Sequence, residues 1–392
     1  MSSNRKIKTS FSFQNQPRLV RGGKDYFFEL EKMIDEAKES IQLQVYIYED
    51  DQTGKTIAAA LLRAAKRGVR IQVLLDGYAS RSLNNGFKEE LRSAGIMLRF
   101  FEPILKSRNY YFGRRMHHKI VVCDGVKALV GGINISDRYN DMPDEPAWLD
   151  WAVWVEGDIP FELHKVCNYF YAKNEKDRIL VDRKKIKSNL PPTQHCPMRI
   201  RRNDWVMNLN QISATYMEMF REAREEIIIM SSYFLPSAFF KHNIIQALKR
   251  GVKVKLILAG MSDVGIAKHA ERYLYKWAVQ HGIEIYEYKH NILHGKMAVC
   301  DQRVTTVGSF NINDISALAS IELNLDIEES EFSMHVHKTF LEIIENDCVK
   351  IHPMQVMRDY NFLEQTMQWL SHETIRVVFK LFTFYFSKEK KS

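Results

Sequence analysis

Short apolar runs alternate along the chain with segments in which apolar residues recur at helical spacing. In the N-terminal part this spacing predicts a helix over Tyr26–Lys38, an apolar strand over Ile41–Tyr48, a second helix over Thr56–Arg67 and a second apolar strand over Val69–Leu75. Gly68 directly follows the second helix, as is typical of a helix C-terminus. Strands that alternate with helices predict an α/β fold in which helices cover the faces of a sheet.

The same pattern occurs a second time further along the chain. Four segments recur in the same order in both halves. These pairs are AKESIQLQVYIYED and AREEIIIMSSYFLP, KRGVRIQVLLDG and KRGVKVKLILAG, AGIMLRFFEP and HGIEIYEYKH, and HHKIVVCDGVKALVGGIN and HGKMAVCDQRVTTVGSFN. Each half is therefore predicted to contain helix, strand, helix, strand, helix and then two strands joined by a turn.

The repeat and a change in composition divide the chain into five parts. The stretch between Tyr171 and Pro197 is rich in Lys and Arg and contains a Pro pair near its end, as expected of a linker. The five expected parts are an N-terminal extension (1–19), a first half (20–172), a basic linker (173–197), a second half (198–350) and a C-terminal helical tail (351–392).

Composition narrows the class of protein. The 392 residues are 45% hydrophobic and 27% charged, which excludes a disordered or collagen-like chain. The formal net charge of +8 favours an anionic partner such as nucleic acid, phospholipid head groups or a phosphorylated substrate. The 5 cysteines are scattered, so we expect a reducing compartment and no disulfide framework. No apolar run is long enough to span a bilayer, and we expect no secretory signal.

One composite motif, H-x-K-x4-D-x6-G-[GS]-x-N, occurs in both halves. Its members are His117, Lys119, Asp124, Gly131, Gly132 and Asn134 in the first half, and His294, Lys296, Asp301, Gly308, Ser309 and Asn311 in the second. Because strand side chains alternate between faces, each His-x-Lys pair is predicted to lie on one face of a strand. A turn at the Asp follows, and the return strand reaches Gly-Gly or Gly-Ser, where small side chains would let backbone amides approach a ligand.

Together, the two motif copies predict a site for phosphoryl chemistry. Two imidazoles, two ammonium groups and two carboxamides would surround a phosphate whose oxygens gain charge during reaction. One imidazole can attack phosphorus while the other protonates the leaving oxygen. We find neither HExxH nor an Asp/Glu cluster with metal spacing, so we expect no metal and no cofactor. The His, Lys, Asp and Asn positions are the predicted catalytic set, and Gly131, Gly132, Gly308 and Ser309 the predicted substrate contacts.

The double motif resembles that of the phospholipase D superfamily, and within it the bacterial cardiolipin synthases. Supporting phrases are VYIYEDDQTGK, Tyr233-Phe234-Leu235-Pro236 and Trp148-Leu149-Asp150. The resemblance covers about residues 20–350. It implies an α/β fold with two phospholipase D-like domains related by a pseudo-twofold axis, each a mixed, mostly parallel sheet flanked by helices.

The resemblance also implies roles for individual residues. His117 would be the nucleophile that forms a phosphohistidine, and His294 the general acid and base. The carboxylates that orient the histidines in the family correspond to Asp150 and Glu322, and we assign each to the histidine of its own half. The motif aspartates, Asp124 and Asp301, would then hold the turn without contacting substrate. His118 is expected to face away from the site.

This resemblance implies a phosphatidyltransferase that converts two phosphatidylglycerol molecules into cardiolipin and glycerol. One alternative is a phospholipase D-type phosphodiesterase or nuclease that uses water as acceptor. Another is a catalytically silent module that binds lipid or nucleic acid, although the intact motif positions argue against it. The expected partners are an anionic phospholipid and a membrane surface, with nucleic acid only under the alternatives. Because one chain supplies both half-sites, a monomer would suffice.

Two further segments suggest contact with a membrane. The loop 106–115 (KSRNYYFGRR) carries four basic and three aromatic residues. This composition is typical of a solvated surface loop, of a loop that contacts lipid phosphates at the membrane interface, or of a loop that binds single-stranded nucleic acid. The segment 375–386 (IRVVFKLFTFYF) is apolar with one narrow polar stripe, so the tail 374–392 either inserts into the membrane interface or packs on the core. We therefore expect a peripheral membrane protein at the cytoplasmic face of a bacterial inner membrane.

Overall fold

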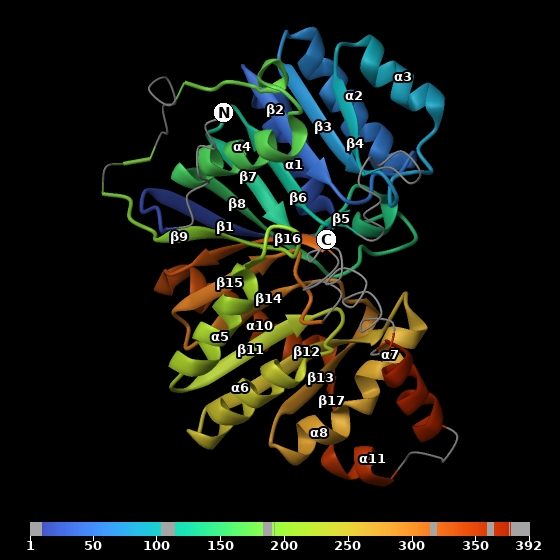
Figure 1. Ribbon diagram of the computed structural model, residues 1–392, viewed down its shortest axis with the longest axis vertical. Coiled ribbons are helices and arrows are strands. Elements are labelled where there is room, and N and C mark those ends of the chain that lie inside the picture. The colour runs from blue at the N-terminus through green and yellow to red at the C-terminus, as the bar shows by residue number, and fades with distance from the viewer. Residues whose placement is uncertain are drawn as a thin grey trace, which may run out of the picture.

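The computed structural model describes residues 10–102, 114–182, 190–191, 193–313, 320–358, 364–375 and 377. Two halves of similar architecture lie against each other, the first above and the second below in Figure 1. Each half is organised around one mixed β-sheet, in the order β1-β8-β7-β6-β2-β3-β4 and β10-β9-β16-β15-β14-β11-β12-β13-β17. The prediction of an α/β fold with two related sheets is confirmed.

The first sheet has seven strands. They are β1 (Asn15–Arg21), β2 (Ser40–Val45), β3 (Arg70–Asp76), β4 (Met97–Phe101), β6 (Lys119–Cys123), β7 (Lys127–Gly131) and β8 (Trp151–Gly157). Parallel pairing is confined to β2-β3-β4, and the other neighbours are antiparallel. The sheet is therefore mixed but not mostly parallel, because β6, β7 and β8 return on one another without a crossover helix. Residues 15–19, which we assigned to an N-terminal extension, form part of its edge strand β1.

The second sheet repeats this topology. Its strands are β9 (Met198–Asp204), β10 (Leu209–Asn210), β11 (Glu226–Ser231), β12 (Lys253–Met261), β13 (Glu284–Ile292), β14 (Met297–Cys300), β15 (Val304–Gly308), β16 (Ser320–Ile327) and β17 (Cys348–Lys350). Strands β9, β16, β15, β14, β11, β12 and β13 follow the order of β1, β8, β7, β6, β2, β3 and β4. A short strand of the first half, β5 (Arg115–Met116), pairs in parallel with β16 and so joins the halves.

Helices cover both sheets. They are α1 (Lys24–Glu36), α2 (Gln52–Lys66), α3 (Asn85–Ser93), α4 (Asp158–Tyr171), α5 (Gln211–Glu222), α6 (Ala238–Lys249), α7 (Gly265–Tyr273), α8 (Tyr275–Gln280), α10 (Ser330–Asp347) and α11 (Pro353–Arg358), with 3₁₀ turns at Asp137–Tyr139 and Glu175–Asp177. Helix α2 begins after Asp51, whose side chain accepts a hydrogen bond from Gly54 N–H. It ends before Gly68, whose φ of 85° is the left-handed conformation that the sequence predicts there.

Three apolar layers hold the elements together. Helices α1, α2 and α3 pack on the outer face of the first sheet, and α5, α6 and α8 on the outer face of the second. The inner faces of both sheets share a third core with α4 and α10, which includes Val153 of β8 and Leu325 of β16. Burial of this common core drives the halves together and fixes how the two motif copies face each other.

Parts of several predicted segments lie outside the described residues. These are most of the loop 106–115, residues 183–189 and 192 of the linker 173–197, and nearly all of the segment 375–386. The first residue of that apolar segment, Ile375, packs against the buried side chains of Leu235, Ala270 and Leu274. Within the described part of the chain, no helix is both long enough and apolar enough to span a bilayer.

Candidate active site

Both His-x-Lys motifs lie at the carboxyl edge of the parallel strands. Lys119 is the first residue of β6 and pairs with Val45, the last residue of β2. Lys296 directly precedes β14, whose first residue pairs with Met230 near the end of β11. In α/β proteins this edge is the usual position of ligand sites. The repeat therefore places two equivalent half-sites, one at the carboxyl edge of the parallel strands in each sheet.

Backbone hydrogen bonds join the half-sites across the boundary between the halves. The amide of His117 donates to the carbonyl of Ile321 over 2.9 Å, and the amide of His294 donates to the carbonyl of Leu149 over 2.7 Å. Ile321 and Leu149 directly precede the two carboxylates of the predicted site. Each histidine is thus aligned with the acid of the opposite half.

The side chains of the histidines and the acids also pair across the boundary between the halves. His117 Nδ1 lies 2.9 Å from Glu322 Oε2, and His294 Nδ1 lies 2.6 Å from Asp150 Oδ2. We expected each acid to orient the histidine of its own half, but the structure pairs them crosswise. The chain order alone does not show this, because the two halves swap their acids at the interface. A carboxylate on Nδ1 leaves Nε2 of each ring as the nitrogen able to meet a substrate.

The small residues of the motif make room for these acids and strands. A Cβ on Gly132 would lie 2.4 Å from Asp150 Oδ1, and one on Gly308 would lie 2.3 Å from Asn324 Oδ1. A Cβ on Gly131 would lie 2.3 Å from the Trp151 carbonyl oxygen.

We expected the amides of these residues to face a ligand. Instead, the amides of Gly132, Gly308 and Ser309 donate to the carbonyls of Trp151, Lys296 and Leu323, respectively. The hydroxyl of Ser309 donates to Glu322. These three amides are therefore already used, and all four positions support the acids and strands, Gly131 through its close approach to Trp151.

The two lysines are held in different surroundings. Lys119 Nζ donates to the carbonyl of His117 over 2.9 Å and lies 5.0 Å from the ring centre of Tyr46. Lys296 Nζ donates to Ser232 Oγ over 3.0 Å and also to the carbonyl of His294. Both lysines are nearly fully buried, which makes their charges effective on a bound anion.

The two motif asparagines also differ. Asn134 Oδ1 accepts the amide of Ile47 over 3.0 Å, and its side chain also hydrogen-bonds to Tyr139. Asn134 therefore positions the loop after β2. The buried Oδ1 of Asn311 has no hydrogen-bond partner among the described residues.

The motif aspartates hold turns at the opposite ends of their strands, away from the histidines. The carboxylate of Asp124 accepts the amides of Lys38, Glu39 and Ser40. That of Asp301 accepts three amides in the same way, from Arg224, Glu225 and Glu226. Both aspartates adopt positive φ, 55° and 49°, which Asp tolerates better than most residues. The expected structural role agrees with these contacts.

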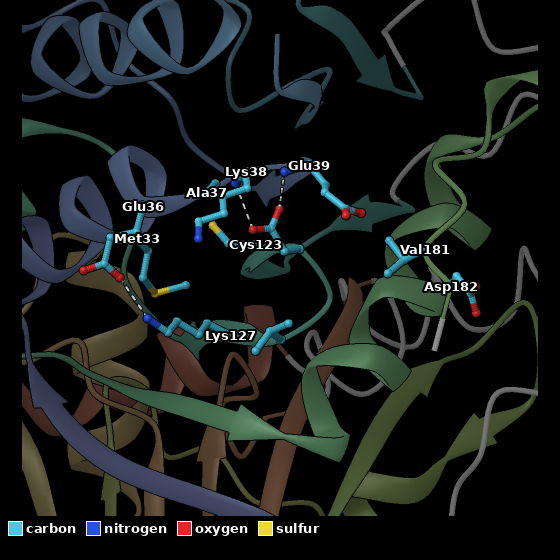
Figure 2. A pocket seen from close by; sticks show the side chains of 11 residues that line it. Met33, Glu36, Ala37, Lys38, Glu39, Cys123, Lys127, Val181 and Asp182 are labelled. Carbon is cyan, nitrogen blue, oxygen red and sulfur yellow. Dashed lines mark hydrogen bonds and ion pairs between the residues drawn. The ribbon is translucent and has the colours of Figure 1, made fainter. Parts of the chain in front are cut away.

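Figure 2 shows Lys38 and Glu39, whose amides donate to the carboxylate of Asp124. The cavity drawn there has a volume of about 330 Å³ and is lined in part by Cys123 and Lys127. It lies at the far end of β6 from His117, so it is separate from the candidate active site.

Aromatic residues that the sequence analysis missed enclose both imidazoles. The ring of Tyr46 packs edge-on against His117 at 4.7 Å between centroids. Tyr139 and Trp148, from the first half, pack against His294 of the second half at 5.2 and 5.9 Å. Tyr46 directly follows β2, so its place at the carboxyl edge of a predicted strand was the available signal.

Burial shifts the pKa values of the ionisable groups in the site. Desolvation lowers the pKa of His117 and opposes the effect of Glu322, which favours the neutral imidazole. Desolvation also lowers the pKa of Lys296 to about 8 and raises that of Asp150 to about 7. The charge of Lys296 acts on the pKa of His117, and the charge of Lys119 acts on that of His294. The two half-sites therefore form one electrostatic unit.

The histidines remain partly accessible while their acids do not. The side chains of His117 and His294 are 15% and 10% exposed, and those of Glu322 and Asp150 are 0% and 1% exposed. His118 faces the other way, as expected, and its ring is buried against Phe170 of α4. Among the described residues, no group of three or more His, Cys, Asp or Glu is placed to hold a metal ion.

The duplicated fold and the crosswise pair of His-x-Lys sites define a phospholipase D-like protein, and comparisons agree. Residues 30–152 and 216–344 match the family model described as "Cardiolipin synthase, PLD-like domain". Cardiolipin synthase B of Escherichia coli K12 is 35% identical over 353 residues, covering 88% of this chain and 84% of the relative. The major cardiolipin synthase of Bacillus subtilis is 29% identical over 85% of this chain and 69% of the relative.

A solved structure shows the same fold. The crystal structure of phosphatidylserine synthase from Haemophilus influenzae covers 95% of this chain and 97% of its own, with a TM-score of 0.74 and 14% identity. The chain belongs to the family of cardiolipin synthases with a phospholipase D-like domain. It is accordingly an enzyme, a transferase of the phospholipase D superfamily.

Proposed function

We propose that the chain is a phosphatidyltransferase that forms cardiolipin and glycerol from two molecules of phosphatidylglycerol through a phosphohistidine. The observation that carries this proposal is the crosswise pairing of two histidines with two buried acids, beside two buried lysines. The names of the relatives support the lipid substrate. The geometry supports the phosphodiester chemistry.

In the first step, His117 Nε2 attacks the phosphorus of one phosphatidylglycerol. Glu322 on Nδ1 stabilises the imidazolium that forms, as the bond from phosphorus to the glycerol oxygen breaks. Burial raises the pKa of Asp150 to about 7, so the His294–Asp150 pair can hold a proton at neutral pH and pass it through His294 to that oxygen, and glycerol leaves. Lys119 and Lys296 offset the charge that builds up on the phosphoryl oxygens.

In the second step, a hydroxyl of another phosphatidylglycerol attacks the phosphohistidine. His294 takes the hydroxyl proton, the bond between phosphorus and His117 breaks, and cardiolipin forms. Water could attack the same intermediate and give phosphatidic acid. Transfer therefore requires that the acceptor hydroxyl be held in place while water is kept away. The aromatic enclosure by Tyr46, Tyr139 and Trp148 supports such shielding.

The test is incubation of the purified protein with phosphatidylglycerol vesicles, followed by thin-layer chromatography. We expect cardiolipin plus glycerol. Phosphatidic acid alone would indicate hydrolysis, and cleavage of DNA without any lipid product would indicate a nuclease. His117→Ala and His294→Ala should each abolish turnover, whereas His281→Ala, at an exposed position after α8, should leave turnover at the wild-type rate. Wild-type turnover by either of the first two variants would refute the roles proposed here.

We also propose that the protein works as a monomer on the cytoplasmic face of a bacterial membrane. The net charge of +8 supports attraction to anionic lipid, and one chain contributes both half-sites. The contact of Ile375 with the core supports packing for the start of the tail. Liposome flotation with and without residues 374–392 tests the remainder, and equal binding would dismiss the tail as an anchor.

A further inference from the structure

An exposed carboxylate stands at the edge of the second half-site. Asp263 follows β12, and Tyr233 follows the neighbouring parallel strand β11, so both lie at the carboxyl edge that carries the His-x-Lys motifs. The hydroxyl of Tyr233 donates to Asp263 Oδ1. Asp263 is exposed, and in the described part of the chain Tyr233 is its hydrogen-bond partner. Its second oxygen is therefore available to a ligand.

This pair lies on the His294 side of the site. Ser232, next to Tyr233, accepts the hydrogen bond from Lys296 over 3.0 Å. The hydroxyl of Tyr139 lies 3.5 Å from His294 Nε2. Burial raises the pKa of Tyr139, and the negative charge of Asp263 makes a smaller contribution in the same direction. The same charge acts on the pKa of His294. Asp263 is thus an electrostatic neighbour of the proposed general acid and base.

The first half-site has no matching arrangement among its described residues. In the ungapped match of KRGVRIQVLLDGYAS with KRGVKVKLILAGMSD, Ser80 occupies the position of Asp263. The hydroxyl of Ser80 binds the backbone of Tyr46 and Tyr48. The carboxylate of Asp76, at the end of β3, is buried and accepts the amides of Tyr78, Ala79 and Met116. The two sides of the pseudo-twofold site therefore differ in what they offer a substrate.

A carboxylate at this place selects the chemistry of its ligand. It repels phosphoryl oxygens, which favours phosphate at the two lysines, and it accepts hydrogen bonds from hydroxyl groups. An ammonium group would fit less well, because Lys296 and Lys119 already oppose positive charge around His294. We infer that Asp263 and Tyr233 form a binding site for the hydroxyl groups of the head-group alcohol, on the side where His294 exchanges the proton.

The inference rests on the proposed function and deepens it. While one hydroxyl oxygen of a polyol attacks the phosphohistidine and its proton passes to His294, a neighbouring hydroxyl donates to Asp263. Water and simple alcohols have no such neighbouring hydroxyl. The pair therefore gives a polyol an advantage over water at the moment of transfer, which is the positioning that synthesis requires.

The experiment uses a donor without a polyol head group, a phosphatidyl ester of p-nitrophenol in mixed micelles. Glycerol or 1-propanol is added as acceptor, and the ratio of phosphatidyl alcohol to phosphatidic acid is measured. This ratio reports how one intermediate divides between alcohol and water, independently of how fast the intermediate forms. We expect Asp263→Ala to lower the ratio for glycerol about tenfold, the effect of one hydrogen bond to a charged group, and to change that for 1-propanol less than about twofold.

Further variants sharpen the result. Tyr233→Phe should lower the glycerol ratio by a smaller factor, and Asp263→Glu should restore part of it. Glu89→Gln, an exposed carboxylate on α3, is the matched control and should keep the wild-type ratio. An unchanged glycerol ratio in Asp263→Ala, or equal losses for both alcohols, would overturn the inference. If the wild-type protein gave no phosphatidyl product from any donor, the proposed function itself would be refuted, which is a different result.

Discussion

Nδ1 of His117 lies 2.9 Å from Oε2 of Glu322, a residue of the opposite half. The reciprocal contact joins His294 to Asp150. Neither half therefore contains a complete histidine–acid pair, although each contains one histidine and one acid. The shared core between the sheets is a condition for the chemistry as well as for stability, because separation of the halves would leave both imidazoles without their carboxylates.

The crosswise pairing makes a specific prediction for histidine titration. Glu322→Gln removes the negative charge that favours protonated His117, so the pKa of His117 should fall by about one pH unit or more, while that of His294 changes less. The measurement is NMR of imidazole protons over a pH series, with His117→Ala for assignment. If Asp150→Asn lowered the pKa of His117 more than Glu322→Gln does, the acids would be paired within their own halves.

A second prediction concerns the alkaline side of the pH–rate profile. Burial lowers the pKa of Lys296 to about 8, so its ammonium is present below that pH and is lost as the pH rises through it. Because the charged form is the one that binds phosphoryl oxygens, kcat/KM should decline above pH 8. Lys296→Arg, whose guanidinium stays charged, should have a lower rate and a shallower decline between pH 8 and 10, because burial also lowers the pKa of Lys119, which still loses its charge. A wild-type profile that stays flat to pH 10 would show that the charge of Lys296 is not required.

The sequence was sufficient to predict those parts of the site that depend on residues close together in the chain. The resemblance to the family implied the turn roles of Asp124 and Asp301, and the repeat and the His-x-Lys motifs at strand ends follow from spacing along one segment. Spacing does not predict which histidine each acid contacts, because that depends on how the two sheets dock. Likewise, Tyr139 and Trp148 reach His294 only across the interface. The expectation of mostly parallel sheets was wrong, because only the strands on one side of β2 and of β11 pair in parallel, whereas their neighbours on the other side, β6 and β14, pair antiparallel.

The turn role of Asp124 can be tested by stability. Asp124→Ala removes an acceptor of three amides and places Ala at a φ of 55°, so it should lower the free energy of unfolding by about 2 kcal/mol. Asp124→Asn keeps one acceptor oxygen and a residue that tolerates this φ, and should lose less. Urea unfolding followed by circular dichroism gives both values. A variant that loses turnover completely yet keeps full stability would instead point to a direct part for Asp124 in the reaction.

The space next to Asp150 gives the last prediction. A methyl group on Gly132 would lie 2.4 Å from Asp150 Oδ1, closer than any real contact, so Gly132→Ala must displace the acid that orients His294. Misplacing a group that positions a reacting residue by about 1 Å can cost about 100-fold, and we expect a loss of kcat of that order with unchanged binding of phosphatidylglycerol vesicles. Gly265→Ala is the matched control, because an added Cβ there meets no atom within 4 Å. Steady-state kinetics on vesicles, with circular dichroism to confirm folding, measures both variants. Wild-type kcat in a folded Gly132→Ala protein would show that the position of Asp150 does not limit turnover.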